Sequence, residues 1–381
     1  MFIQNRKFGE RPRRTAELFV ALTGIGLVAV AVVYNHAWLD HHILPDFFVA
    51  HDSYLAIADL VRLAMVLLGA CLTLFGRRRL ARILAGLGLA GAFRLATAVL
   101  LALVVSELVL RATVPALVAR YEARHEPARL DDARLGWVSV PNHVGQSVIG
   151  GRRIEYRWDA NGYRVRDARH GVDLDRPTLI FAGESVMFGH GLTWDESIPA
   201  QVGKLLNLQS ANLAVNAYST DQTAMRSAIE LTHFRQPVAI VTLFSPDLFF
   251  KNLNPNRPHF DSRLVWHRAD NRWRLRVLFD GLNPFSSDAS VAAGVSKTRP
   301  VLRATRELAR QRHAKSLVVV PMFNPEQPAE RELRHRVLDG TGLPFVVVSL
   351  DPSLRIPIDG HPNARAATLI ARAIASSLSA D

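Results

Sequence analysis

Cysteine is almost absent from this sequence of 381 residues: the only one, Cys71, lies inside an apolar stretch. A disulfide framework and a zinc site built from several cysteines are therefore excluded within one chain. Oxidising compartments stay open, because many domains in such compartments have no disulfide.

Lysine is also scarce, so the formal net charge of +12 comes almost wholly from arginine. The lysines are Lys7, Lys204, Lys251, Lys297 and Lys315. A basic balance can indicate nucleic acid or anionic lipid as a partner. No basic helix is interleaved with stacking aromatics, and many arginines flank apolar segments. We therefore expect no nucleic-acid partner and interpret the excess mainly as an arginine-biased surface.

Apolar residues are concentrated before about residue 115, where three segments have the composition of membrane-spanning helices. We predict a membrane domain over residues 1–111, with spans at about 18–34, 54–75 and 83–110. A cleavable signal peptide is the alternative for the first segment, because a basic start and an apolar middle fit that too. The two apolar segments that follow favour an anchor.

Charged residues interrupt the second and third segments. Asp59 and Arg62 are three residues apart and so share one helical face, where they can pair. Arg94 lies in the third segment, and Glu107 and Arg111 stand four apart near its end. A transporter-like role is one interpretation of such residues. Three spans are few for a translocation path, which favours a plain anchor.

Basic residues are distributed unevenly between the loops. The N-terminal tail carries five Lys or Arg residues, and Arg77-Arg78-Arg79 starts a second basic loop, whereas the loop of residues 35–52 has none. By the positive-inside rule the tail and the second loop are cytoplasmic. With three spans, everything after about residue 112 is expected outside the cytoplasmic membrane, in the periplasm or the extracellular space of a bacterial-type cell.

The rest of the chain divides into a connecting region at 112–174 and an α/β domain at 175–381. Asn161-Gly162 between two short runs predicts a β-hairpin over 152–165 in the connecting region, after a helical stalk. Strands are predicted at 178–182, 211–215, 238–244, 316–322 and 345–348, and helices at 196–208, 221–235, 295–314, 327–340 and 363–379. This alternation predicts a parallel sheet with helices on both faces. Residues 252–287 break the alternation and are interpreted as an insertion near the strand ends.

Ser185 follows the first of these strands, where open α/β sheets bind ligands. A serine hydroxyl needs a base, usually an imidazole that a carboxylate holds in one tautomer. His361 and Asp359, in the loop before the last helix, can supply these groups. A turn and helix cap at Asn363 is the alternative for that loop, and His190 is interpreted as a loop residue. No His-Glu-x-x-His motif supports a metal site, and no cofactor is expected.

Three segments together resemble the SGNH/GDSL hydrolase superfamily over residues 175–380. Gly183-Glu184-Ser185 resembles the Gly-Asp-Ser block, Asn212 to Gln222 the second block, and Ile358 to Ala364 the last block. The resemblance implies a flavodoxin-like three-layer α/β/α domain with a mostly parallel five-stranded sheet. It also implies Ser185 as nucleophile, His361 as base and Asp359 as its orienting acid, in the Asp-x-His spacing of some branches.

Two positions depart from the family pattern. Ala217 stands where the oxyanion-hole glycine is expected, and its backbone N–H, with that of Ser185, can still serve. Pro246 stands in place of the oxyanion asparagine and has no donor. Loss of one such donor costs about 3 kcal/mol in an enzyme that relies on it. Asn252 or another loop residue is a candidate replacement.

These features predict a membrane-anchored serine esterase or acyl-transfer enzyme. Its expected partners are the membrane and an ester-bearing glycan or lipid outside the cell membrane. A catalytically impaired scaffold or glycan-binding protein of the same fold is the alternative. Pro246 and the separation of Ser185 from His361 are the features that distinguish the two.

Overall fold

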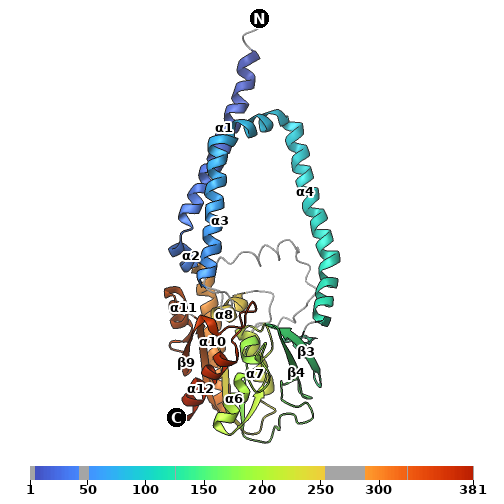
Figure 1. Cartoon of the computed structure of the whole chain (residues 1–381), viewed down its shortest axis with the longest axis vertical. Coiled ribbons are helices and arrows are strands. Elements are labelled where there is room, and N and C mark those ends of the chain that lie inside the picture. Colours follow the sequence, from blue (N-terminus) through green and yellow to red (C-terminus); the bar gives the residue numbers. More distant parts are fainter. Residues whose placement is uncertain (1–4, 43–50, 125, 254–287, 324, 381) are drawn as a thin grey trace. The chain divides into compact units, whose positions relative to one another are not determined.

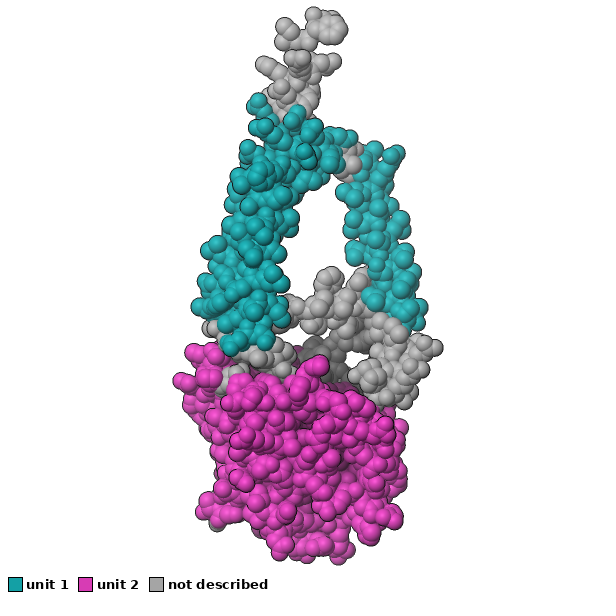
Figure 2. Space-filling view, in the orientation of Figure 1, with its two compact units in different colours: residues 1–43, 51–117, 272–285 teal, residues 44–50, 118–271, 286–381 magenta. Residues whose placement is uncertain are grey.

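The structure, a computed structural model, describes residues 5–42, 51–124, 126–253, 288–323 and 325–380. Contacts divide the chain into two compact units, which Figure 2 shows in different colours. The first contains the N-terminal helices up to residue 117, and the second contains the α/β domain with the short strands that precede it.

Helices make up the first unit (Figure 1): α1 (Asn5–Val33), α2 (His36–His42), α3 (His51–Cys71), the π-helical turn η1 (Leu72–Gly76) and α4 (Arg77–Arg124). Three segments are long and apolar enough to cross a membrane: Arg13–Val33, Asp52–Gly86 and Phe93–Thr113. At 1.5 Å per residue, the 21 residues of the first and third segments reach about 32 Å, close to the thickness of the hydrocarbon core. Arg77–Arg79, which were predicted to start a loop, instead begin α4, so the second segment continues past its predicted end to Gly86. Gly88, with φ +58°, interrupts α4 just after it.

Helices α1 and α3 approach closely at two glycines. A Cβ on Gly24 would lie 2.6 Å from the carbonyl oxygen of Gly69, so only glycine fits there. The predicted pair of Asp59 and Arg62 is formed at 2.9 Å. Asp59 also contacts His36 at 2.8 Å, and Arg62 donates to the carbonyl of Ala31. These contacts tie α1, α2 and α3 together, which is a structural role.

Two separate antiparallel pairs lie between α4 and the α/β domain. Strand β1 (Arg129–Asp132) pairs with β2 (Gly136–Ser139), and β3 (Val144–Ile149) pairs with β4 (Arg152–Arg157). The predicted hairpin over 152–165 is present but short. Backbone hydrogen bonds from Asp159 to Tyr163 and from Val165 to Arg157 close its turn, and one bridge joins Trp158 and Arg164. The full ladder instead turns at Gly150-Gly151, where φ values of +55° and +75° suit a tight hairpin turn.

The α/β domain is built on one parallel sheet with the order β6-β5-β7-β8-β9. Its strands are β5 (Thr178–Phe181), β6 (Gln209–Asn212), β7 (Pro237–Leu243), β8 (Lys315–Phe323) and β9 (Phe345–Leu350). This is the flavodoxin-like order, in which the chain changes direction across the sheet beside the first strand. The predicted fold class is confirmed, and every strand pair in the sheet is parallel.

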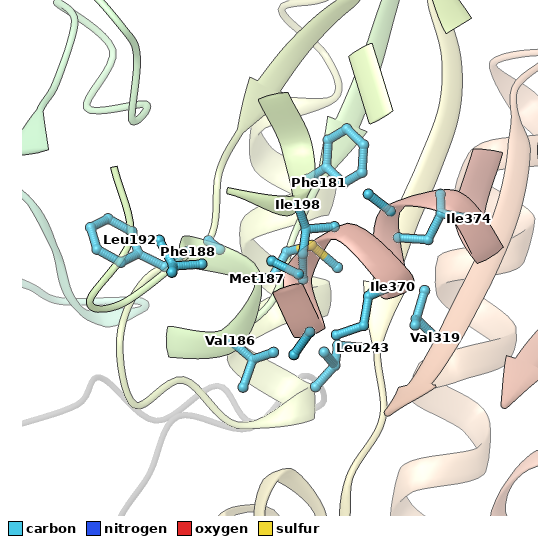
Figure 3. Packing of buried hydrophobic residues seen from close by; sticks show 14 of the residues in the cluster. Phe181, Val186, Met187, Phe188, Leu192, Ile198, Leu243, Val319, Ile370 and Ile374 are labelled. Carbon is cyan, nitrogen blue, oxygen red and sulfur yellow. The ribbon is translucent and has the colours of Figure 1, made fainter. Parts of the chain in front are cut away.

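Successive residues of the strands point to opposite faces of the sheet and pack against two helical layers. Leu179 and Val319 pack in the cluster that contains α6 (Ile198–Leu206) and α12 (Ala364–Ser379), whereas their neighbours Ile180 and Val318 face the opposite layer. That layer contains α7 (Thr220–Glu230), α8 (Pro246–Leu253), α10 (Asp288–Gln311) and α11 (Pro328–Leu338). Figure 3 shows the first cluster, with Met187 beside Ile198 from α6.

All five predicted strands and the five predicted helices are present, with ends that shift by a few residues. Helix α10 begins earlier than predicted, at Asp288. Helix α8 was not among the predicted helices. The remainder of the predicted insertion, residues 254–287, lies outside the described residues.

Candidate active site

Ser185 lies at the carboxyl end of β5, at the point where the chain reverses its direction across the sheet. It is the first residue of the short helix α5 (Ser185–Phe188) and is 6% exposed. The tight connection requires Gly183, because a Cβ there would lie 2.8 Å from the Cβ of Met187. Strand β5 and this turn therefore fix the backbone that carries the Ser185 hydroxyl.

A compact loop between η2 (Pro352–Leu354) and α12 carries Asp359 and His361. The backbone N–H of Ile356 donates to the carbonyl of His361, and the side chain of Asn363 caps α12. Ile358 has φ +68°, a strained conformation for a β-branched residue. The loop therefore holds Ile358, the residue before Asp359, in a conformation that its side chain does not favour.

The structure brings Ser185, His361 and Asp359 together. His361 Nε2 lies 2.8 Å from Ser185 Oγ, and His361 Nδ1 lies 2.7 Å from Asp359 Oδ1. A carboxylate can only accept, so Nδ1 carries the proton and Nε2 is the atom able to accept the serine proton. The three side chains have the geometry of an activated nucleophile, its base and the acid that orients the base.

Asp359 faces a second imidazole that the sequence did not indicate. His190 Nε2 lies 3.6 Å from Asp359 Oδ2, and the rings of His190 and His361 are 4.6 Å apart. Burial alone would raise the pKa of Asp359, but the two imidazoles facing it hold its pKa well below its ordinary value. Asp359 is therefore a carboxylate throughout the pH range of ordinary enzymes.

His190 is fixed from behind by Asn216, whose amide Nδ2 lies 3.0 Å from His190 Nδ1. Burial lowers the pKa of His190, and the neighbouring His361 adds to this, which together outweigh the opposite effect of Asp359. His190 thus favours the neutral form. The glycines on either side, Gly189 and Gly191, were a sign of an unusual backbone, but nothing in the sequence connected them to Asp359.

Glu184 places a second carboxylate next to the nucleophile. Its Oε2 lies 3.1 Å from Ser185 Oγ and accepts a hydrogen bond from Lys251 Nζ at 2.9 Å. Lys251 also pairs with Asp247 at 2.5 Å. Burial alone would lower the pKa of Lys251, but Glu184 and Asp247 raise it above its ordinary value. Lys251 is therefore an ammonium ion that neutralises Glu184.

Ala217, Pro246 and Asn252 were the residues expected to form or replace the oxyanion hole. Ala217 has φ +66°, the left-handed conformation in which glycine is usual. Pro246 begins α8 and supplies no N–H. Asn252 does not replace it, because its amide donates to Asp221 and Thr298 and its oxygen accepts from the Asp221 backbone. Asn252 therefore joins α7, α8 and α10 as a structural residue.

A buried arginine organises the loop that follows α5. Arg164 is 1% exposed and donates to the carbonyls of Phe188 at 2.5 Å, Gly189 at 2.9 Å and Leu192 at 2.6 Å. Burial lowers its pKa to about 10, so it remains charged at neutral pH. Arg164 thereby holds the segment that carries His190.

His190, Asp359 and His361 offer potential metal ligands within 4.8 Å of one another, the one such group found among the described residues. The imidazole nitrogens that face the Asp359 carboxylate carry protons, whereas a metal ligand must present a lone pair. The donor set fits a proton-handling network better than a metal centre.

No family model and no curated protein sequence matches the chain. Solved structures that are similar to it include three bacterial proteins. The first, from Desulfitobacterium hafniense, is assigned to the G-D-S-L lipolytic family (11% identity, TM-score 0.36, 52% of this chain and 98% of that one). The second is an acetyl xylan esterase from Butyrivibrio proteoclasticus (12% identity, TM-score 0.34, 55% of this chain and 65% of that one). The third is a carbohydrate acetylesterase family member from Sinorhizobium meliloti (14% identity, TM-score 0.33, 53% of this chain and 97% of that one). At such TM-scores the similarity does not decide the chemistry, for which the atoms of the site are the evidence.

Proposed function

We propose that this chain is a membrane-anchored serine hydrolase of the SGNH/GDSL type, an esterase or O-acyltransferase. The observation that carries the proposal is the continuous chain of contacts from Ser185 Oγ through His361 to Asp359. Of the described residues, these offer the serine, the imidazole and the carboxylate that acyl transfer requires.

In the proposed acylation step, Ser185 Oγ attacks the carbonyl carbon of an ester while its proton moves to His361 Nε2. Asp359 stabilises the imidazolium that forms. The backbone N–H groups of Ser185 and Ala217 are the proposed donors to the oxyanion. When the tetrahedral intermediate collapses, His361 returns the proton to the departing alkoxide, which leaves as the alcohol.

In the second step His361 takes a proton from an incoming hydroxyl, which attacks the carbonyl carbon of the acyl-serine. The bond between that carbon and Ser185 Oγ then breaks, and His361 returns the proton to Ser185 Oγ. With water the product is a carboxylic acid; with a sugar hydroxyl it is a new ester. Both steps use the same base and the same nucleophile position, so the geometry supports hydrolysis and transfer equally.

The proposed substrate class is an ester-bearing glycan or lipid outside the cytoplasmic membrane. Two features support this proposal. Three helices are long and apolar enough to span a membrane, and the basic residues of the N-terminal tail and of Arg77–Arg79, at the start of α4, predict that both lie on the cytoplasmic side. An odd number of spans then leaves the α/β domain on the outer side.

Fluorophosphonate labelling and p-nitrophenyl acetate turnover test the proposal. Wild-type protein should be labelled at Ser185 and should release p-nitrophenol, and Ser185→Ala should lose both signals. Ser353→Ala, at an exposed serine in η2, is the matched control and should keep them. Equal labelling of wild type and Ser185→Ala would show that Ser185 is not the nucleophile.

A scaffold or glycan-binding role remains the second candidate because Pro246 has no donor and the side chain of Asn252 is engaged elsewhere. The 2.8 Å contact of Ser185 with His361 disfavours it, since a scaffold has no need of an assembled triad. Glycan binding by a wild-type protein that no fluorophosphonate labels would favour the scaffold.

A further inference from the structure

We propose that His190 is a positioning residue for the reaction, a second imidazole that holds Asp359 from the side opposite His361. The inference rests on the proposed function, because it assigns His190 a role in the same proton transfer. It goes further by naming a residue that lies outside the Ser185, His361 and Asp359 set.

The protonation of His190 follows from its neighbours. Asp359 Oδ2 can only accept, so the His190 Nε2 that faces it at 3.6 Å carries the proton. Neutral His190 must then accept at Nδ1, and Asn216 Nδ2 supplies a donor there at 3.0 Å. Asn216 therefore selects the tautomer in which His190 presents an N–H to Asp359.

The two oxygens of Asp359 are thus divided between two rings. Oδ1 accepts from His361 Nδ1 and from the His361 backbone N–H, while Oδ2 faces His190. At 3.6 Å the second contact is electrostatic and longer than a hydrogen bond. Such contacts in unliganded sites commonly shorten when the reacting complex forms.

The backbone around His190 is fixed more firmly than an ordinary loop. Arg164 binds the carbonyls of Phe188 and Gly189, and the N–H of His190 donates to the carbonyl of Ser185 at 2.9 Å. Gly191 has φ +74° and its N–H donates to the Tyr156 hydroxyl. These backbone contacts fix the position from which the His190 ring faces Asp359.

Two histidines beside one carboxylate suit a division of roles. During acylation His361 gains a proton, and a second positive charge 4.6 Å away would oppose that step. A neutral His190 avoids this repulsion and still offers Asp359 a donor. His190 thereby orients the carboxylate without competing for the proton.

His190→Phe tests the proposal, because phenylalanine keeps a ring against His361 and removes the N–H. We expect kcat for p-nitrophenyl acetate to fall by about 10- to 100-fold, the usual effect of losing an orienting partner, with KM nearly unchanged. Asp359 with one donor fewer attracts the proton of its partner base more strongly, so the acidic limb of the pH–rate profile should move to higher pH.

His190→Gln should restore most of kcat and return the acidic limb toward its wild-type position, because its amide can donate from about the same place as Nε2. Asn216→Leu, which removes the donor to Nδ1, should change the profile in the same direction as His190→Phe and guards against a phenylalanine variant that fails to fold. His170→Phe, at an exposed histidine paired with Asp167, is the matched control and should change neither quantity.

The outcomes separate the two proposals. If wild type reacts and His190→Phe keeps its kcat and pH profile, or if His190→Gln is as impaired as His190→Phe, the role of His190 is overturned alone. If wild type neither turns over the ester nor takes the fluorophosphonate label, the proposed function is overturned and the role of His190 with it. Slower turnover and a shifted acidic limb, both restored by His190→Gln, support the inference.

Discussion

At the scale of single residues, the charge beside the nucleophile is the feature that most needs explanation. Glu184 is 1% exposed, and its Oε2 contacts both Ser185 Oγ and Lys251 Nζ. A carboxylate in that position competes with His361 for the serine proton and repels the oxyanion that forms. Lys251 offsets this repulsion, and because it also pairs with Asp247 at 2.5 Å, the three side chains form one ion-paired cluster beside the nucleophile.

Lys251→Met should therefore slow acyl transfer. A unit charge about 5 Å away costs about 3 kcal/mol at an effective dielectric constant of about 20, which corresponds to about 100-fold in kcat/KM. The double variant Lys251→Met/Glu184→Gln should recover much of this loss, because a neutral amide needs no cation. The measurement is p-nitrophenyl acetate turnover over a range of ionic strengths.

Lys204→Met is the control for that experiment, since Lys204 is exposed on α6 and takes part in none of the site contacts described above. It should leave turnover unchanged. A single variant as active as wild type, or a double variant no better than the single one, would contradict the neutralising role of Lys251.

At the scale of secondary-structure elements, the segment after α5 depends on one buried arginine. Three carbonyls of residues 188–192 accept from Arg164, which belongs to the connecting region before the sheet. Arg164 also stacks on the rings of Tyr156 and Phe188, at 4.7 Å and 4.8 Å from their centroids. The short strands before the α/β domain are thus part of the support for its site.

Arg164→Met should destabilise the α/β domain by about 3–5 kcal/mol, because methionine fills the space but removes three charge-assisted hydrogen bonds to buried carbonyls. The carbonyls of Phe188 and Gly189 keep one other donor each. Arg166→Met is the matched control: Arg166 is exposed and paired with Asp195, so its loss should cost at most about 0.5 kcal/mol. Thermal unfolding of the full chain and hydrogen exchange of residues 188–192 measure the two effects. Comparable losses for both variants would show that the buried contacts of Arg164 contribute no special stability.

The accuracy of sequence-based prediction also differs by element. Four of the parallel strands are largely apolar runs and were predictable for that reason, and the alternation of strands and helices was enough to predict a parallel sheet. Strand β6 (Gln209–Asn212) is mostly polar, so it was predicted two residues late, from the apolar run that follows it. The β3–β4 turn was missed because Asn161-Gly162 gave a stronger hairpin signal than Gly150-Gly151. Helix α8 was missed because a proline at its first position looks the same as a proline in a loop.

The site was predictable where a motif covered it and not elsewhere. Ser185, Asp359 and His361 stand in recognisable blocks at strand and helix ends, and the fold brings those ends together. His190 and Lys251 lie close to their partners only because the loop after α5 and helix α8 fold over the same sheet edge. No local sequence pattern indicates such a contact, so the roles of both residues became visible only in the three-dimensional structure.

At the scale of the whole molecule, the central question is on which side of the membrane the α/β domain lies. Three apolar helical segments and the basic residues of the tail and of Arg77–Arg79 predict an outer location. An even number of spans would reverse this and would expose the site to cytoplasmic esters instead of envelope glycans or lipids.

Alkaline phosphatase fusions decide the matter, because this enzyme is active only outside the cytoplasm, where its disulfides form. A fusion after Asp381 should be active, and so should one after His42, in the first predicted outer loop. A fusion after Arg79 should be inactive and serves as the cytoplasmic control. Activity after His42 combined with inactivity after Asp381 would mean that the third segment does not cross, and the substrate class would then have to be sought inside the cell.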